Sequence, residues 1–182
     1  MSSKIKFVTI GYIEWRKGQD LLFDAIESMS DEVKEQALFT VIGQNTSLMA
    51  QNLAKKIKSM PYISMPGTVS REEIHNILEQ ANVMICPSRE DPMPTVCAEA
   101  MMHKVPCIVS DATGTAAYIK DGFDGLIFKS EDVDELRSKI IWCIDNHDIL
   151  PEMGDGAFGI YQRIFSMESF EKNLLKYVHE II

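Results

Sequence analysis

The feature that most constrains the fold of this chain is a regular alternation of short apolar runs with longer amphipathic segments. Six of the apolar runs read as strands: Ile5–Ile10, Leu38–Ile42, Tyr62–Met65, Val83–Cys86, Cys107–Val109 and Leu126–Phe128. Continuous apolar runs of this length are typical of strands that are buried on both faces of a sheet. The alternation therefore predicts an α/β fold, with a doubly wound parallel sheet of about six strands and helices on both of its faces.

The segments with helical periodicity are Gln19–Met29, Leu48–Ser59, Arg71–Gln80, Thr95–His103, Thr115–Lys120, Asp132–Asn146 and Met167–Ile182, and a weaker pattern covers Glu152–Arg163. Ser70, with Glu73 three residues later, predicts a capping box at the start of the third helix. No linker or internal repeat divides the 182 residues, and this length suits one domain of ordinary size. We therefore predict a single domain over residues 1–182.

The charge of the chain restricts its partners. It carries 18 Lys and Arg residues against 27 Asp and Glu residues, which gives a formal net charge of −9. Proteins that bind nucleic acid need a basic face to neutralise phosphates, so we expect no nucleic-acid partner. An anionic ligand would have to be held by a local group of cationic side chains and backbone N–H donors.

The cysteines and histidines show no spacing typical of a metal site. Each cysteine lies in an apolar run, which predicts reduced core cysteines in a cytoplasmic protein; they are Cys86, Cys97, Cys107 and Cys143. The histidines are scattered, and we expect structural or surface roles for His75, His103, His147 and His179. No apolar run reaches the ~20 residues of a membrane span, and no secretory signal is recognisable.

The oddest segments of the sequence follow the predicted strands. Ligands bind at the carboxyl ends of the strands of a doubly wound sheet. The loops at these ends are rich in glycine, proline, charged and hydroxyl residues, and they are Gly11–Gly18, Gly43–Ser47, Pro66–Ser70, Pro87–Pro94 and Ser110–Gly114. The expected fold and the composition of the loops thus both predict a candidate site at the carboxyl ends of the strands.

Two of these loops carry candidate ligand-binding groups. Lys17 lies at the start of a predicted helix, where free N–H groups attract anions. The alternative interpretation is that Arg16 and Lys17 are charges of a solvated loop with no ligand. Thr95 and its neighbours open a second helix whose N–H groups are able to face a phosphate. Glu99 lies about one turn inside that apolar helix, where a carboxylate is costly unless it is paired. Two explanations stay open for it: a buried ion pair, or hydrogen bonds from a polyol ligand.

The segment Pro87–Met101 resembles the signature of a large family, the group 1 glycosyltransferases, which are retaining enzymes with the GT-B fold. That signature, PSxxEGFGxxxxEAMAxGxPV, has two acidic residues separated by seven others, and Asp91 and Glu99 match this spacing. Pro92-Met93-Pro94 stands where Gly-Phe-Gly is usual, as in a DPxP subset of the family.

Further pieces match in the same order along the chain. Upstream, Gly11 with Lys17-Gly18 is similar to the family's GRLxxxKG, and Gly67-Thr68-Val69 resembles its GxV loop. Downstream, the resemblance continues through Lys104–Asp111 and Asp121–Phe128. It thus covers nearly the whole chain.

The resemblance implies a fold and a function. In this family a C-terminal Rossmann-like domain, the second half of the GT-B fold, binds a nucleotide-diphosphate-sugar donor. The chain is then the donor-binding domain of a retaining glycosyltransferase that transfers a hexosyl group to an acceptor, for example in polysaccharide or glycoconjugate synthesis. Such enzymes generally act without a bound metal, so neither a metal nor another cofactor is expected.

The resemblance also implies site residues. Catalytic roles fall to Lys17, which would neutralise the donor diphosphate, and to Asp91, which would bind hydroxyls of the transferred sugar. Glu99 would accept hydrogen bonds from the ribose hydroxyls. The other implied donor contacts are Gly11, Arg16, Pro66, Gly67, Thr68, Met93, Thr95 and Val96. Of these, the Pro66–Thr68 loop would frame the base through backbone atoms.

Some positions depart from the family pattern. Tyr12 stands where an arginine usually assists the lysine, and Arg16 is a candidate substitute. Ala117 stands where an acidic residue is usual, and Thr113 replaces one glycine. Tyr12 and Ala117 are consistent with an alternative function, a non-catalytic module that senses a nucleotide or nucleotide sugar. Another GT-B enzyme, such as a nucleotide-sugar epimerase, is a third possibility.

The family pattern implies that this domain is covalently joined to a second domain. GT-B enzymes hold the acceptor in an N-terminal domain, which this sequence does not contain, and any peripheral membrane association would run through that domain. Met167–Ile182 resembles the terminal helix that packs back across both domains of the family. We therefore expect this chain alone to be inactive in transfer.

Overall fold

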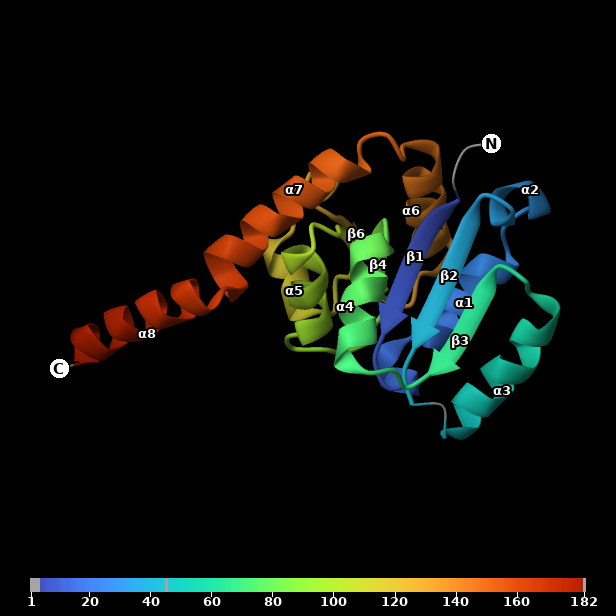
Figure 1. The fold of residues 1–182 in the computed structure, drawn as a ribbon, viewed down its shortest axis with the longest axis horizontal. Helices are drawn as coiled ribbons and strands as arrows, with labels where there is room; N and C mark the ends of the chain where they lie inside the picture. The colour runs from blue at the N-terminus through green and yellow to red at the C-terminus, as the bar shows by residue number, and fades with distance from the viewer. Residues whose placement is uncertain (1–3, 45, 182) are drawn as a thin grey trace.

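The sheet has the predicted doubly wound topology. The computed structural model describes residues 4–44 and 46–181, except for the side chains of residues 173 and 176–181. Six parallel strands form one sheet in the order β3-β2-β1-β4-β5-β6 (Figure 1). They are β1 (Ile5–Ile10), β2 (Ala37–Ile42), β3 (Ile63–Gly67), β4 (Val83–Cys86), β5 (Cys107–Ser110) and β6 (Leu126–Phe128). The order reverses between β1 and β4, which makes this seam the switch point of the sheet.

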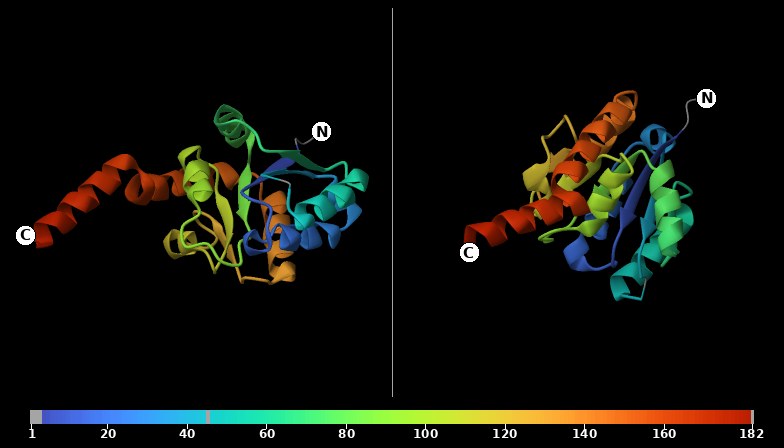
Figure 2. Two further views of the ribbon diagram at one scale, coloured as in Figure 1. Left: turned by 90° about the horizontal axis from the view of Figure 1, so that it is seen from below. Right: turned by 60° about the vertical axis from the view of Figure 1, so that its left-hand side comes forward.

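Helices connect the strands and follow the last one. The α-helices of the described chain are α1 (Gln19–Glu27), α2 (Asp31–Lys34), α3 (Leu48–Lys56), α4 (Arg71–Gln80), α5 (Thr95–Met102), α6 (Val133–Asp145), α7 (Leu150–Ile160) and α8 (Met167–Ile181). The capping box predicted at Ser70 and Glu73 is present at the start of α4. Helices lie on both faces of the sheet (Figure 2), so the predicted α/β class is confirmed.

The alternation of side chains along the strands builds two cores. On β1, Ile5 and Phe7 join a core with residues of α1, α3 and α6, whereas Val8 joins a second core with α4, α5 and α7. The rings of Phe7 and Phe39, which are paired across β1 and β2, stack with centroids 5.0 Å apart. Burial on both faces is why these strands are apolar without alternation.

Several elements differ from the prediction in type or extent. Residues Gly114–Tyr118 form a 3₁₀ turn, not the α-helix predicted over Thr115–Lys120, because the N–H groups of Ala116 and Ile119 bond to carbonyls three residues earlier. Pro66 and Gly67 were predicted in a loop and belong to the end of β3. The short helix α2 was not predicted, and the weak pattern over Glu152–Arg163 corresponds to α7 and a π turn over Tyr161–Phe165.

Helix α8 extends away from the body of the molecule (Figures 1 and 2). It packs mainly on the preceding π turn. Met167, Phe170, Leu174 and Leu175 on this helix are all more than half exposed. A helix over Met167–Ile182 was predicted, and it is present as far as Ile181, while Ile182 lies outside the described residues.

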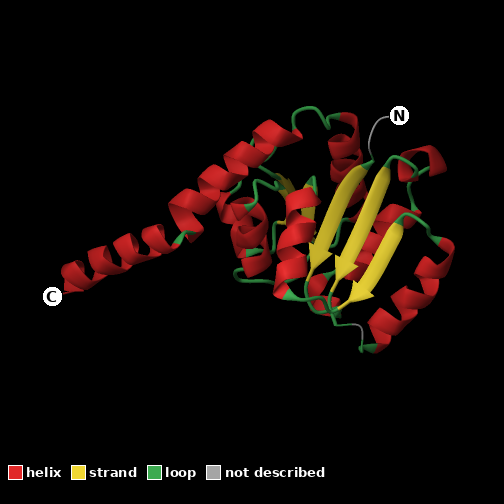
Figure 3. Cartoon of the chain, viewed as in Figure 1, coloured by secondary structure: helices red, strands yellow, loops and turns green. Residues whose placement is uncertain are grey.

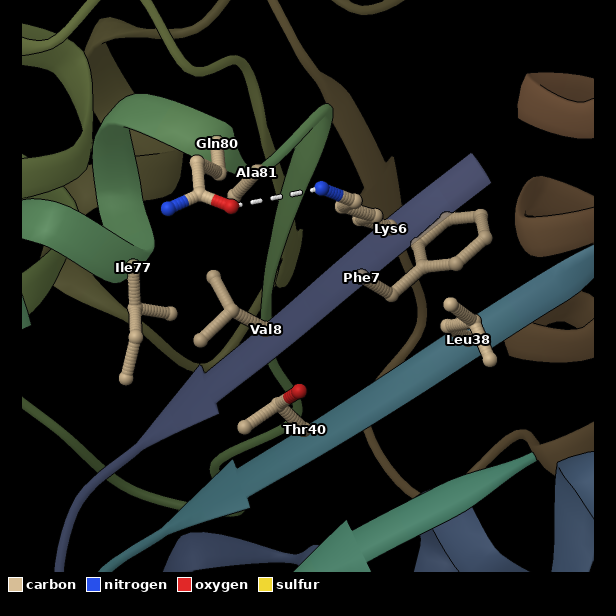
Figure 4. A pocket seen from close by; sticks show the side chains of 8 residues that line it. All are labelled: Lys6, Phe7, Val8, Leu38, Thr40, Ile77, Gln80 and Ala81. Carbon is tan, nitrogen blue, oxygen red and sulfur yellow. Dashed lines mark hydrogen bonds between the residues drawn. The ribbon is translucent and has the colours of Figure 1, made fainter. Parts of the chain in front are cut away.

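The outer face of β2 beside α4 is partly uncovered (Figure 3). A hollow of about 240 Å³ lies there, lined by Lys6, Phe7, Val8, Leu38, Thr40, Ile77, Gln80 and Ala81 (Figure 4). The Lys6 Nζ atom lies 3.5 Å from Gln80 Oε1 across it. This hollow lies along the strands and not at their carboxyl ends, so it is separate from the loops that carry the candidate residues.

The buried cysteines generate a test of the fold. All four thiols are buried and free, and burial raises the pKa of Cys143 to about 12. The thiol pKa values of Cys86 and Cys97 are raised by their neighbouring thiols and by burial. We expect no reaction with a thiol-specific chromogenic reagent at pH 8 in the native protein, and four equivalents in denaturant. Rapid native labelling of any of the four would contradict the packing described here.

Candidate active site

The loop between β1 and α1 is tightly organised. Ser47 Oγ donates a hydrogen bond to the carbonyl of Ile13 at 2.6 Å, and Gln19 Nε2 donates to the carbonyl of Tyr12 at 2.8 Å. Residues Trp15–Lys17 then form a 3₁₀ turn that ends at Gly18. Gly18 has a φ of +69°, and a Cβ atom there would lie 2.0 Å from the carbonyl oxygen of Pro87. The turn thus brings Lys17 against the loop that follows β4.

Lys17 and Asp91 meet across these two loops. Lys17 Nζ lies 2.5 Å from Asp91 Oδ2, and the two side chains are 20% and 9% exposed. The loop around Asp91 is itself attached to the loop after β5, since Gly114 N donates to the carbonyl of Asp91 at 2.9 Å. A Cβ atom on Gly114 would lie 1.8 Å from the carbonyl oxygen of Pro92, so this close approach requires a glycine.

Arg89 also connects the loop after β4 with the segment between β1 and α1. It was not predicted as a site residue. Its Nη1 and Nη2 atoms bind both carboxylate oxygens of Asp20 at 2.9 and 2.8 Å, and Nη1 also donates to the carbonyl of Trp15 at 2.6 Å. Its Nε donates to Glu131 at 3.0 Å. The guanidinium lies 4.7 Å from the centroid of the Trp15 ring. The hydrogen bonds to Asp20 raise the pKa of Arg89 above its usual value, so the side chain remains a cation.

Backbone contacts complete the connection. The N–H of Arg89 donates to the carbonyl of Arg16 at 2.8 Å. The Arg16 side chain donates to the carbonyl of Glu90 at 3.1 Å and pairs with Glu14 at 3.1 Å. Arg16, expected as a substitute for the arginine replaced by Tyr12, therefore bridges the two loops at an exposed position. Sequence patterns alone offered no signal for Arg89, because its partners are distant in sequence.

Helix α5 starts beside Asp91. Thr95 is exposed and Val96 is half-buried in its first turn, where N–H groups have no carbonyl one turn earlier, and the exposed Met93 lies two residues before the helix. Glu99 is half-buried, and among the residues that the structure describes it takes part in no salt bridge. Of the two explanations left open for this carboxylate, the buried ion pair is therefore wrong, because the position is not buried deeply enough to demand one.

A cavity opens at the ends of β1 and β2. Its volume is about 260 Å³, and its lining is Ile10, Gly11, Tyr12, Ile42, Gly43, Gln44, Thr68, Val69 and Ile74. The structure therefore places Gly11 and Thr68, two predicted donor contacts, in one cavity. Gly67 is buried at the end of β3, and its carbonyl accepts a hydrogen bond from Gly43 N at 3.0 Å. Pro66, beside it, is exposed.

The predicted residues thus gather in two places along one edge of the sheet. Arg16, Lys17 and Asp91 form a charged group at the seam between β1 and β4, close to the start of α5. Gly11 and Thr68 line the cavity at the ends of β1 and β2. Tyr12, whose side chain is mostly exposed, belongs to the cavity lining and was predicted only as a departure from the family pattern.

The prediction that the histidines are scattered is wrong for two of them. His75 and His103, predicted as scattered, lie together, with Nδ1 of one 2.9 Å from Nε2 of the other. His179 lies outside the described side chains.

No group of three or more potential metal ligands from His, Cys, Asp and Glu is found in the part of the chain that the structure describes. None of the helices within that part is long and apolar enough to cross a membrane.

The fold and its strand-end loops define a doubly wound α/β domain of the kind that binds ligands at a switch point. The family model for group 1 glycosyl transferases matches residues 2–157, and the chain belongs to this family. An uncharacterized glycosyltransferase of Methanocaldococcus jannaschii is 24% identical over 178 residues, which cover 94% of this chain and 47% of the relative.

Solved structures share the fold. A sucrose-phosphate synthase from Thermosynechococcus elongatus superposes with a TM-score of 0.84 at 18% identity, over 98% of this chain and 45% of that one. Anabaena HepE in complex with UDP-glucose gives a TM-score of 0.83 at 17% identity, over 97% of this chain and 49% of that one. Both superpositions show that this chain has the same fold as the matching part of these proteins. The chain spans about half the length of each of these relatives.

Arg89 generates a prediction about stability. Arg89→Lys keeps the charge but loses the two-pronged contact with Asp20 and the hydrogen bond to Trp15, so we expect unfolding free energy to fall by about 1–3 kcal/mol. Arg137→Lys is the matched control, because Arg137 contacts only exposed partners, Asp134 at 2.9 Å and Ser28 Oγ at 3.3 Å, and the change should alter stability by less than about 0.5 kcal/mol. Urea unfolding measures both. Equal effects would show that Arg89 does not hold the loops together.

Proposed function

We propose that this chain supplies the donor site of a retaining glycosyltransferase that transfers a hexosyl group from a nucleotide diphosphate sugar to an acceptor. The single observation that carries the proposal is the group formed by Lys17, Asp91 and the first turn of α5 at the switch point. Membership of the group 1 family, together with the UDP-glucose bound in the HepE complex, supports the same class of ligand.

The chemistry of transfer fits these residues. As the glycosidic bond breaks, negative charge develops on the departing diphosphate. Lys17 and the N–H groups of Met93, Thr95 and Val96 would stabilise that charge, which lowers the energy of the transition state. Asp91 would accept hydrogen bonds from the transferred sugar and Glu99 from the ribose. Gly11, Thr68 and the neighbouring Pro66 and Gly67 would border the nucleoside.

We also propose that the acceptor is held by an additional N-terminal domain in a longer protein, and that the 182-residue chain alone transfers no sugar. Half of the length of its relatives lies outside the match, which supports this view. Neither a metal nor another cofactor is needed for the roles assigned to Lys17 and the α5 N–H groups.

The direct test is a ligand-observed NMR screen of the chain with UDP, ADP, GDP and their glucose esters. We expect binding of one base series with dissociation constants of roughly tens of micromolar to millimolar. Binding of free diphosphate without any nucleotide sugar would favour the sensing alternative. Absence of binding across the panel would refute the donor-site proposal.

A substitution of Lys17 tests whether this residue binds the phosphates and not the nucleoside. Lys17→Ala should weaken binding of the nucleoside diphosphate by about 1.5–3 kcal/mol, because a charge-assisted contact is lost, and should leave the bare nucleoside unaffected. Lys55→Ala on the exposed surface of α3 removes the same charge and is the control. Calorimetric titration measures each affinity. If diphosphate and nucleoside bind the native chain equally, the assigned phosphate site is wrong.

Glu99 separates a ligand role from a structural one. Glu99→Gln should change the free energy of unfolding by less than about 1 kcal/mol, because no described ion pair is broken. It should weaken binding of the ribonucleotide, and less so that of the 2′,3′-dideoxy nucleotide. Thermal melting and two titrations test this. A large drop in melting temperature with unchanged ribose discrimination contradicts the assignment.

A further inference from the structure

The two charged residues proposed to hold different parts of the donor are bound to each other. Lys17 Nζ and Asp91 Oδ2 are 2.5 Å apart, and Asp91 is the more buried partner. This contact has a cost for any diphosphate that Lys17 binds, because the anion must share or replace a carboxylate already at hydrogen-bond distance.

Apart from Lys17, the described cations nearest to Asp91 are paired with other carboxylates. Arg16 is paired with Glu14, and Arg89 is occupied by Asp20 and Glu131. Within the described part of the chain, Lys17 is the one salt-bridge partner of Asp91. A phosphate that draws Lys17 away therefore leaves a nearly buried carboxylate unpaired.

The backbone keeps Asp91 in place. Its carbonyl accepts a hydrogen bond from Gly114 N at 2.9 Å, and residues Asp91 and Thr113 form a parallel bridge. Lys17 is attached at its own end, since its N–H donates to the carbonyl of Glu14 at 3.0 Å. The longer lysine side chain is able to rotate away from this contact, whereas the carboxylate would stay beside the proposed phosphate position and repel the anion.

An intact nucleotide sugar differs from a free diphosphate at this point. Its sugar hydroxyls would donate hydrogen bonds to Asp91 in place of the contact with Lys17. Its diphosphate also carries less negative charge than that of the free nucleoside diphosphate. We propose that Asp91 is a specificity-determining residue that makes the site prefer the intact nucleotide sugar over the free nucleoside diphosphate by competing for Lys17. The same competition favours release of the diphosphate product after transfer. This inference rests on the donor site proposed above.

The test is Asp91→Asn in the 182-residue chain, titrated with UDP and UDP-glucose, or with the ADP or GDP pair if that base binds more tightly. The variant should bind the free diphosphate more tightly than the native chain does, by roughly five- to thirtyfold, between the effects of an exposed and a buried charge. It should bind the nucleotide glucose no more tightly, so the preference is reversed.

The control is Glu90→Gln, which removes the same charge one residue earlier, where the side chain is exposed. It should change both affinities by less than about twofold, because an exposed charge is screened. In a Lys17→Ala background, Asp91→Asn should give a smaller gain, since the competition has been removed. Asp91→Ser serves as a second variant, and thermal melting checks that each variant is folded.

The outcomes separate the two proposals. If the native chain binds the diphosphate and Lys17→Ala weakens binding, but Asp91→Asn and Asp91→Ser bind it no better than the native chain, the competition is refuted and the donor site stands. A gain equal to that of Glu90→Gln also refutes it, because general charge then explains the effect. If no diphosphate or nucleotide sugar binds the native chain, the donor site itself fails.

Discussion

The structure depends on how the two halves of the sheet are joined at the seam between β1 and β4. The strands pair there only at Phe7 with Val83 and at Val8 with Met84, whereas β1 pairs with β2 over its whole length. At the amino end, the Asn82 side chain accepts a hydrogen bond from Lys6 N at 2.8 Å and extends the ladder. Beyond the carboxyl ends of the two strands, at the switch point, contacts between the loops join the two halves.

Arg89 and the Lys17–Asp91 pair supply those loop contacts. A guanidinium with its planar set of donors is suited to this role, because it binds Asp20 with two hydrogen bonds and still reaches a carbonyl and Glu131. The chain has a formal net charge of −9, and where these loops meet, the cationic side chains of Arg16, Lys17 and Arg89 are each paired with a carboxylate. In our proposal, an anion would be held at this edge by the local arrangement of Lys17 and the free N–H groups at the start of α5, and not by the overall charge.

Much of the fold could be predicted from the sequence, because burial on both faces leaves continuous apolar strands such as Val83–Cys86. The loops that carry the candidate residues followed from strand order in the same way. What escaped prediction was long-range pairing. The partner of Asp91 depends on the fold of a loop 74 residues earlier, and the contact of His75 with His103 depends on how α4 and α5 pack. Element ends were misplaced where tertiary contacts decide them, as at Gly114.

Helix α8 turns a local bend into a large displacement. Its 15 residues extend about 22 Å from the π turn at Tyr161–Phe165. A change of about 10° at that turn would move the far end by about 4 Å, which is close to the width of a side chain. The direction of this arm therefore depends on the backbone of the π turn, and any surface that contacted the exposed Phe170 and Leu174 would change it enough to alter the hydrodynamic shape of the molecule.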